Sequence, residues 1–330
     1  MGAIEQNLQP TAGDIAAAAR RLAGVAVRTP LINAPALDER LSARVFLKAE
    51  TLQRTGSFKF RGAYNKIASI PPDQRAAGVV AYSSGNHAQG VAAAARLLGL
   101  RATIVMPSDA PSAKRARTEA LGAEIVPYDR DRQDRAAIAK KLVAERGATL
   151  VPPYDDPLVI AGQGTIGAEI ADDLARLGLA PDIVLVGASG GGLAAGTALG
   201  IKAKAPSANI FIVEPDGFDD TLRSFASGKR EVNARMSGTI CDALMTATPG
   251  ELTFPITRAL IGQGFTVSDA EVARAVRYAF EELKLVVEPG GAVALAALLA
   301  GKLDVEGKAV AAILSGGNVD AELFARLIGA

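Results

Sequence analysis

The sequence predicts an α/β protein built from two doubly wound open-sheet domains. Short apolar runs, such as residues 182–186 and 309–314, have the length and composition of buried parallel strands. Helical patterns separate these runs, and glycine-containing turns such as 187–192 lead from a strand into the next helix. Strands that alternate with helices in this way form parallel βαβ units, so we expect an open parallel sheet in each domain.

The composition excludes several classes of protein. The chain has 330 residues, of which 49% are hydrophobic, and a formal net charge of +1. This length supports two packed cores, and the lack of a long run of like charges argues against a nucleic-acid partner. The N-terminal segment is polar and the apolar stretches are too short for a bilayer, so we expect a cytoplasmic protein with no membrane partner. A single cysteine, Cys241, excludes an intrachain disulfide, and we expect it to be a buried packing residue.

Helix and strand alternate through the first half of the chain. Asp14 is expected to cap the first helix, and Pro71-Pro72 to end the second. The expected helices cover residues 15–22, 59–70, a segment from the Asn86 turn to about 98, one that starts near Pro111, and 135–146. The expected strands cover residues 43–50, 78–82, 102–106 and 124–128.

The second half repeats the pattern after a predicted crossing between domains at Pro152-Pro153. Residues 162–165, Gly-Gln-Gly-Thr, are expected at the head of a helix because glycines are typical of turns. The remaining expected strands cover residues 182–186, 209–213 and 309–314, and the remaining helices cover 193–204, a long segment opened by Ser268, and 292–300.

One lysine lies in an unusual position. In the segment Thr55-Gly-Ser-Phe-Lys-Phe-Arg-Gly62, Lys59 stands at the opening turn of a predicted helix between Phe58 and Phe60. The partial positive charge of a helix N-terminus and partial burial both disfavour an ammonium group, so the pKa of Lys59 is expected to be low. A neutral amine is a nucleophile for an aldehyde. The alternative is a solvated lysine in the first turn.

A glycine turn at the end of a predicted strand offers a second functional element. Gly187-Ala-Ser-Gly-Gly-Gly192 would present consecutive backbone N–H groups at a helix N-terminus, where they bind phosphate. Two alternatives would also explain these glycines: close packing of the strand against the helix, and a binding site for a dinucleotide. A nucleophilic lysine combined with a phosphate cradle favours a phosphorylated aldehyde, and pyridoxal phosphate is that molecule.

With these motifs the chain resembles the fold-type II pyridoxal-phosphate enzymes, in particular the serine/threonine dehydratase and serine racemase group. TGSFKFRGA, SSGNHAQG, SGGGL and SGGN carry the resemblance, which extends from about residue 25 to the C-terminus. It implies a Schiff base on Lys59 with Phe58 against the cofactor, and Asn86 at the pyridine 3-hydroxyl. It also implies that Ser315 faces the ring nitrogen. The implied phosphate loop consists of Ser189, Gly190, Gly191, Gly192 and Leu193.

The resemblance further implies a tryptophan synthase β-like architecture and a lyase reaction. Residues 1–53 and 157–330 would form the large cofactor-binding domain and 54–156 a small mobile substrate domain. The expected reaction converts L-threonine or L-serine to a 2-oxo acid and ammonia by α,β-elimination. Alternatives are a 3-hydroxyaspartate dehydratase, a serine racemase and, in another class, a non-enzymatic phosphometabolite-binding protein. The partner is a small amino acid, and a homodimer is expected by analogy.

The same resemblance supplies a substrate set and a cation set. The substrate residues would be Ser83, Ser84, Gly85, His87 and Arg135, with Ser84 as a second base on the opposite face and Arg135 as a clamp for a second carboxylate. The set Glu214, Phe218 and Asp220 matches a divalent-cation site for Mg²⁺, or for Ca²⁺ or Mn²⁺, through hard oxygen ligands. This sequence departs from the family pattern at Ser189, which replaces a glycine, and at Cys241-Asp242-Ala243.

Overall fold

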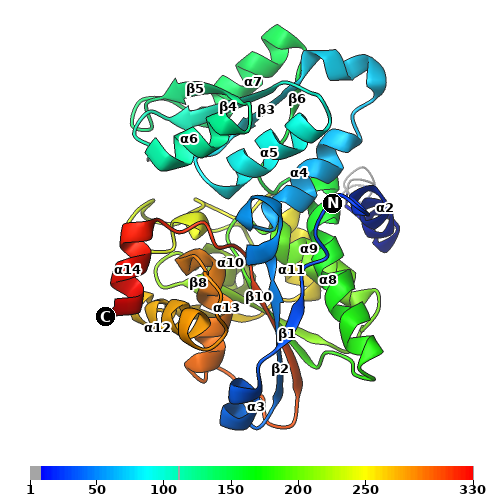
Figure 1. Cartoon of the computed structure of the whole chain (residues 1–330), viewed down its shortest axis with the longest axis vertical. Coiled ribbons are helices and arrows are strands. Elements are labelled where there is room, and N and C mark those ends of the chain that lie inside the picture. The colour runs from blue at the N-terminus through cyan, green and yellow to red at the C-terminus, as the bar shows by residue number, and fades with distance from the viewer. Residues whose placement is uncertain (1–8, 111, 330) are drawn as a thin grey trace.

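The computed structural model describes residues 9–110 and 112–329. A four-stranded sheet and a six-stranded sheet, each with its own helices, lie one above the other along the long axis (Figure 1). The predicted α/β class with two open sheets is therefore confirmed. The helix start predicted near Pro111 and the first eight residues of the predicted large domain fall outside the described residues.

The six-stranded sheet joins both ends of the chain. Its strand order is β1-β2-β10-β7-β8-β9, and every neighbouring pair is parallel except β1 with β2. β10, the last strand of the sequence, lies between β2 and β7. Its carboxyl end therefore lies beside that of β7, which leads into the glycine turn at 187–192. The strands are β1 (Leu31–Asn33), β2 (Arg44–Ala49), β7 (Ile183–Gly187), β8 (Asn209–Pro215), β9 (Gly264–Val267) and β10 (Ala309–Leu314).

Helices cover both faces of this sheet, which explains why its strands are apolar without alternation. On β10, Val310 and Ala312 belong to one core, whereas Ala311 and Ile313 belong to the other. The first core packs against α12 (Asp269–Glu281) and α13 (Pro289–Leu299), and the second against α8 (Pro157–Arg176) and α9 (Gly192–Lys202). The other helices of this half are α2 (Ala12–Leu22), α3 (Pro35–Leu41), α10 (Asp220–Ser227), α11 (Thr253–Leu260), α14 (Ala321–Gly329) and the 3₁₀ turns η1 (Glu50–Leu52), η2 (Arg54–Gly56) and η4 (Asp242–Leu244).

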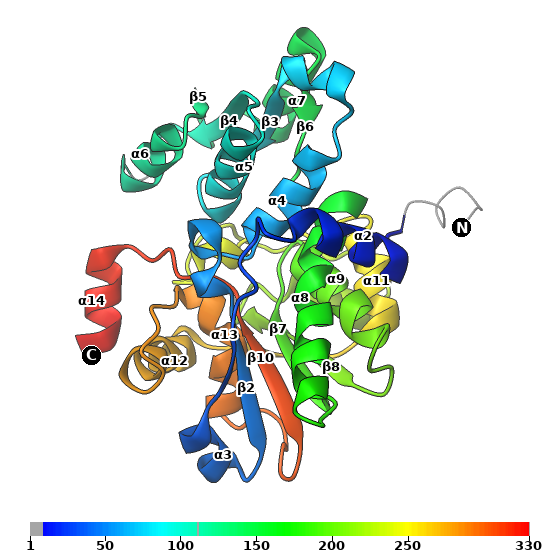
Figure 2. The ribbon, with the colours of Figure 1, turned by 45° about the vertical axis from the view of Figure 1, so that its right-hand side comes forward.

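The four-stranded sheet is parallel throughout, in the order β5-β4-β3-β6. Helices α4 and α5 cover one of its faces and α7 the other. Both views place α4 where the two layers meet (Figures 1 and 2). The elements are β3 (Val79–Tyr82), β4 (Ala102–Pro107), β5 (Glu124–Tyr128), β6 (Thr149–Leu150), α4 (Lys59–Ala68), α5 (Asn86–Leu97), α6 (Ser112–Ala120), α7 (Arg135–Arg146) and the 3₁₀ turn η3 (Pro72–Ala77).

The predicted cap of the first helix is wrong by three residues. Thr11 is the N-cap of α2, and its side chain accepts a hydrogen bond from the N–H of Asp14. Asp14 is the third helical residue, and its carboxylate accepts in return from the N–H of Thr11 at 2.8 Å. This reciprocal capping box satisfies two N–H groups, which is why the helix begins earlier than one capped by Asp14 alone.

The prediction that Gly162 and Gly164 head a helix is also wrong. Helix α8 begins at Pro157, where the Asp156 carboxylate caps two N–H groups, and both glycines lie inside the helix. A Cβ on Gly162 would lie 2.6 Å from the Cα of Gly62, in α4, so the two helices touch backbone to backbone there. These glycines therefore permit close helix packing and do not form a turn.

A buried ion-pair network fixes the start of α4. The Arg61 guanidinium, 1% exposed, pairs with Glu50 at 2.8 Å and with Glu169 of α8 at 2.7 Å. Glu169 also accepts from Lys48 of β2 at 2.7 Å. The network thus ties β2, α4 and α8 together two residues from Lys59.

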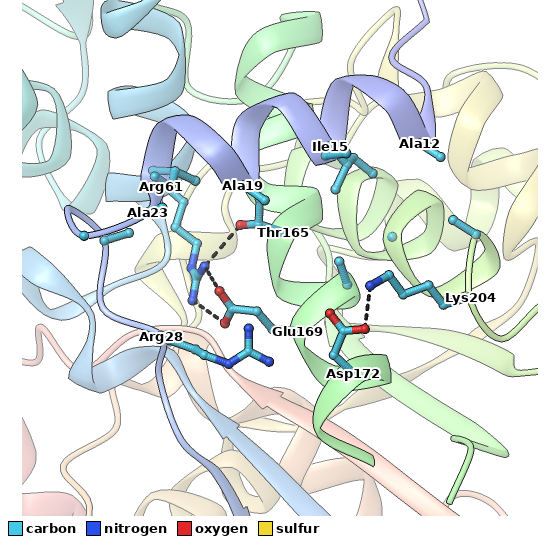
Figure 3. A pocket seen from close by; sticks show the side chains of 17 residues that line it. Ala12, Ile15, Ala19, Ala23, Arg28, Arg61, Thr165, Glu169, Asp172 and Lys204 are labelled. Atoms are coloured by element: carbon cyan, nitrogen blue, oxygen red, sulfur yellow. Dashed lines mark hydrogen bonds and ion pairs between the residues drawn. The ribbon is translucent and has the colours of Figure 1, made fainter. Parts of the chain in front are cut away.

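Beside this network lies a mostly apolar pocket of about 460 Å³ between α2, α8 and α9. Figure 3 shows Arg61 and Glu169 in its wall, with the Lys204–Asp172 ion pair at one side. The pocket receives none of the predicted site residues. Within residues 9–110 and 112–329, none of the helices combines the length and hydropathy needed to span a bilayer.

Candidate active site

A second pocket, of about 480 Å³, gathers the sequence motifs from both sheets. It lies at the carboxyl ends of β3, β7 and β10 and at the first turn of α4, as expected for an open α/β sheet. The predicted residues that line it are Phe58, Lys59, Ser83, Ser84, Gly85, Asn86, His87, Arg135, Ser189, Gly190, Gly191, Gly192, Leu193 and Ser315. Glu214, Phe218 and Asp220 do not line it.

Lys59 is the first residue of α4, in the position that the sequence predicts. Its Nζ donates a hydrogen bond to the carbonyl oxygen of Pro153 at 2.7 Å and lies 5.1 Å from the ring centroid of Phe58. Burial lowers the pKa of Lys59 from 10.5 to about 8, and the negative charge of Glu288 partly opposes this effect. Roughly one Lys59 amine in ten is then neutral at pH 7.

The glycine turn forms a cradle of unused N–H groups at the start of α9. Gly191, the N-cap, has a φ of 90°, a left-handed conformation that favours glycine. A Cβ on Gly190 would lie 2.3 Å from the ring of Tyr154. Among the described residues, no acceptor receives the N–H groups of Gly190, Gly191 or Gly192. These groups and the helix N-terminus are therefore suited to a phosphate.

Ser189 does not direct its hydroxyl toward this cradle. Its Oγ donates to the Oγ1 of Thr246 at 2.5 Å and accepts from the Thr246 N–H at 3.2 Å. The hydroxyl that distinguishes Ser189 from the family's glycine therefore contacts Thr246 and joins the glycine turn to that residue. A glycine here would lose that tether.

Asn86 and Ser315 reach the pocket from different halves of the molecule, Asn86 from the half with the four-stranded sheet and Ser315 from the half with the six-stranded sheet. Asn86 opens α5, and its Nδ2 donates to the Glu288 carboxylate at 2.5 Å. Ser315 follows β10, is 8% exposed, and its carbonyl oxygen accepts from the N–H of Phe58 at 3.1 Å. The Ser315 backbone thereby fixes the residue before Lys59, while its hydroxyl carries no formal charge.

His87 is neutral in this environment. Its Nε2 bonds to the carbonyl oxygen of Val151 at 2.8 Å, and burial, together with the charge of Lys59, lowers the pKa of His87 to about 3. It lines the pocket, yet it cannot act as a cation there at neutral pH. The geometry supports a structural role for the ring and leaves its Nδ1 without a partner among the described residues.

The predicted substrate residues come from the turn after β3, from α5, which contains His87, and from α7. Ser83 and Ser84 follow β3, and the Ser83 hydroxyl accepts from the N–H of Gly85 at 3.2 Å. Arg135, the first residue of α7, stacks its guanidinium 5.6 Å from the ring centroid of Tyr82. It is exposed at the pocket wall.

The candidate cation residues form a buried carboxylate pair behind the glycine loop. The Glu214 carboxylate accepts from the N–H of Thr221 and Leu222 in α10, at 3.1 and 2.9 Å. Burial, then the charge of Asp220, raises the pKa of Glu214 to about 8, and burial raises that of Asp220 to about 6. Asp220 Oδ2 is buried without a hydrogen-bond partner among the described residues, whereas its Oδ1 accepts from Asn233 at 2.7 Å.

Sequence reasoning missed several pocket residues. Glu288 precedes Pro289-Gly290-Gly291, and an acidic residue before proline is a helix-start signal that would have marked this position. Lys114 of α6 pairs with Asp242 of the opposite half at 2.6 Å, across the pocket. At residues 241–243, where the sequence departs from the family pattern, Asp242 therefore forms an ion pair between the two halves. Cys241 is fully buried, as expected.

These features define a class: an α/β enzyme with a low-pKa lysine and an anion cradle in one pocket. The family model described as pyridoxal-phosphate dependent enzyme matches residues 22–316. The chain belongs to this family, and its architecture is that of the fold-type II members. The residues present fit the cofactor, because they supply the amine, unused N–H groups for the phosphate and an amide donor at Asn86.

Three relatives illustrate the range of the match. The chain is 47% identical over 315 residues to L-threo-3-hydroxyaspartate ammonia-lyase from Pseudomonas sp, covering 96% of this chain and 97% of the relative. It is 39% identical over 319 residues to serine racemase from Schizosaccharomyces pombe, covering 97% of both chains. The crystal structure of a threonine deaminase from T.th. superposes with a TM-score of 0.88 at 44% identity, covering 94% of this chain and 99% of that one.

Proposed function

We propose that the protein is a pyridoxal-phosphate-dependent ammonia-lyase that converts a β-hydroxy amino acid to a 2-oxo acid and ammonia. The observation that carries this proposal is the convergence of Lys59, the glycine cradle and Asn86 in one pocket. The relatives named for ammonia-lyase or deaminase activity support it. The sequence alone favoured L-threonine or L-serine as the substrate.

For the preferred substrate we propose 3-hydroxyaspartate. Arg135 stands at the pocket wall and, among the described residues, no carboxylate forms an ion pair with it. Its guanidinium is therefore available to a second substrate carboxylate, which it binds in bidentate fashion. The relative named L-threo-3-hydroxyaspartate ammonia-lyase points the same way.

The chain's own residues divide the chemistry among them. When bound, the cofactor supplies an electron sink for the negative charge that develops at the substrate Cα. Lys59, whose pKa is about 8, would hold the cofactor through its neutral amine, and the same amine would take the proton from the substrate Cα. The unused N–H groups of Gly190 to Gly192 would hold the phosphate, and the Asn86 amide would orient the ring by donating a hydrogen bond. Ser315 would face the ring nitrogen with a neutral hydroxyl, which would keep the electron sink moderate and favour elimination.

Serine racemase activity is the second candidate, and Ser84 is the observation that favours it. Racemisation needs a second base on the face opposite Lys59, and Ser84 lines the same pocket. A serine hydroxyl is a weak base, so we expect racemisation to be slower than elimination.

We also propose a divalent cation, Mg²⁺ or alternatively Ca²⁺ or Mn²⁺, at Glu214, the carbonyl oxygen of Phe218, and Asp220. Two buried carboxylates repel each other, and Asp220 Oδ2 has no partner among the described residues. A cation would satisfy both groups with the oxygen ligands it prefers. Grouped sets of three or more His, Cys, Asp or Glu are absent from the described residues, but this set needs only two carboxylates.

Assembly and location remain further proposals that rest on the resemblance. We propose a cytoplasmic homodimer in which residues 54–156 move as a small domain over the pocket. The Lys114–Asp242 ion pair joins the two halves through partly exposed side chains, so water can replace each partner when the halves separate. Light scattering gives the mass of the assembly directly.

The deciding experiment measures ammonia and 2-oxo acid release from L-serine, L-threonine and each stereoisomer of 3-hydroxyaspartate. The expected result is fastest release from one hydroxyaspartate isomer. Release of neither product from any substrate, by protein that has the absorbance of bound cofactor, would refute the lyase. Protein without that absorbance would instead favour a non-enzymatic binder of phosphorylated metabolites.

A further inference from the structure

Glu288 is a buried carboxylate in the pocket to which no role has yet been assigned. It stands at the N-cap of α13, is 4% exposed, and its N–H donates to the carbonyl oxygen of Gly316 at 3.0 Å. A Cβ on Gly316 would lie 2.2 Å from Glu288 Oε1, so the carboxylate packs directly against the turn after β10. Glycine at 316 therefore makes room for this carboxylate.

The hydrogen bonds around Glu288 fix the orientation of the Asn86 amide. Asn318 Nδ2 donates to the carbonyl oxygen of Thr55 at 2.7 Å, which identifies that atom as the nitrogen. The same nitrogen lies 2.8 Å from Asn86, so the atom it meets there must be the oxygen, Oδ1. The Asn86 nitrogen consequently faces Glu288, at 2.5 Å. An amide nitrogen has two hydrogens, so one N–H remains for a ligand in the pocket.

We propose that Glu288 is the positioning residue for Asn86, holding its amide as a hydrogen-bond donor toward the ring oxygen of the cofactor. The two residues are 202 positions apart and come from opposite halves of the molecule. Without Glu288 the hydrogen bonds from Thr55 through Asn318 still hold Asn86 Oδ1, but no other residue that the structure describes accepts from the Asn86 nitrogen. The proposal rests on cofactor binding and is independent of the amino acid that the enzyme converts.

The charges around Glu288 give this role a pH signature. Burial raises the pKa of Glu288 to about 7, and the negative charge of Asp242 acts in the same direction. The Asn86 hydrogen bond, Lys114 and Lys59 act against the rise. Glu288 therefore ionises near neutral pH, and the charge that appears lies beside the donor that contacts the cofactor.

The test compares the parent protein with Glu288→Gln, Glu288→Ala and an exposed control, Glu306→Gln. Apoprotein of each is titrated with pyridoxal phosphate, and the absorbance of the bound cofactor is followed from pH 6 to 8.5. A glutamine oxygen still accepts from Asn86, so Glu288→Gln should bind within about twofold of the parent. Glu288→Ala should bind about tenfold more weakly, which corresponds to one net hydrogen bond.

The spectrum separates positioning from a merely structural role. In the parent and in Glu306→Gln the bound-cofactor spectrum should change with a midpoint near pH 7, and in Glu288→Gln this change should be absent. The proposal is overturned if Glu288→Gln keeps the transition, if it binds as weakly as Glu288→Ala, or if Glu288→Ala binds like the parent. Should Glu288→Ala fail to fold, the Glu288→Gln spectrum decides. No amino-acid substrate is used, so a failed lyase assay leaves the result unaffected.

Discussion

Replacing Arg135 with alanine tests the proposed substrate. The guanidinium stacks on Tyr82 at the pocket wall and is exposed to solvent, so it is already hydrated before substrate binds. A charge-assisted hydrogen bond contributes about 1.5 to 3 kcal/mol, and an exposed group belongs at the lower end of that range. A loss of about 1.5 kcal/mol corresponds to roughly a tenfold fall in kcat/KM. The kcat/KM of Arg135→Lys should lie between those of the parent and Arg135→Ala, because lysine keeps the positive charge but cannot form the bidentate hydrogen bonds of a guanidinium.

The assay measures ammonia release from hydroxyaspartate, serine and threonine by the parent, Arg135→Ala and a matched control, Arg132→Ala. Arg132 lies three positions away, and its side chain is 85% exposed. The loss in Arg135→Ala should fall on hydroxyaspartate alone, and Arg132→Ala should behave like the parent. Equal losses on all three substrates would refute a clamp for the second carboxylate. A parent enzyme inert toward hydroxyaspartate would return the assignment to a threonine/serine dehydratase.

Three further predictions address the lysine, the cation and the buried network. Lys59→Ala should lose lyase activity by orders of magnitude, and borohydride reduction of the parent should attach the cofactor to residue 59; an adduct on another lysine would contradict this. A chelator should lower the melting temperature of the parent but barely change that of Asp220→Asn, because a ligand of the native state stabilises it by mass action; equal responses would count against the site. Glu169→Gln should lower the free energy of unfolding in urea by about 3 to 5 kcal/mol, since it leaves Arg61 short of a buried partner. The matched control is Glu251→Gln, since the Glu251 side chain pairs with Arg230 but is 79% exposed. This change should alter the free energy of unfolding by less than about 1 kcal/mol, and equal effects of the two substitutions would refute a special contribution from the buried pair.

Local patterns explain the parts of the fold that the sequence predicts. The strand at 309–314 is found with its predicted ends because six consecutive apolar residues can be buried only between two helical layers. The helix over residues 135–146 also has its predicted bounds, since Asp134 caps its start and Gly147 its end. Lys59 opens its helix as predicted. In each case the signal lies within a few residues of the feature.

The remaining features depend on contacts that no local pattern contains. Gly162 resembles a turn residue in the sequence, and only the approach of Gly62 in another helix explains it. The partners of Asn86 lie 202 and 232 positions away, so neither Glu288 nor Asn318 could be paired with it from sequence. The motifs therefore indicate which residues meet in the pocket, and the structure adds how their atoms are oriented.

The last prediction concerns the nucleophilicity of Lys59 in the apoprotein. Its pKa in the folded protein is about 8, below the ordinary 10.5, because burial disfavours the ammonium form. At pH 7 the neutral fraction is then roughly one tenth, about 300-fold more than for an ordinary lysine. The initial rate of cofactor capture should rise about tenfold per pH unit below pH 8 and level off above it. Since the unfolded chain binds more protons between pH 8 and 10.5, the free energy of unfolding of the apoprotein should also rise across that window.

The measurement is stopped-flow absorbance after mixing apoprotein with pyridoxal phosphate, with N-acetyl-lysine as the reference amine. Dividing the two rates cancels the titration of the aldehyde itself. The ratio should be constant below pH 8 and fall between pH 8 and 10.5, where only the reference amine continues to gain its neutral form. Because the charge of Glu288 raises the pKa of Lys59, Glu288→Gln should move the start of the fall to lower pH. A ratio that stays constant from pH 6 to 10 would show that Lys59 titrates like an ordinary lysine, and its burial in the pocket would then carry no consequence for catalysis.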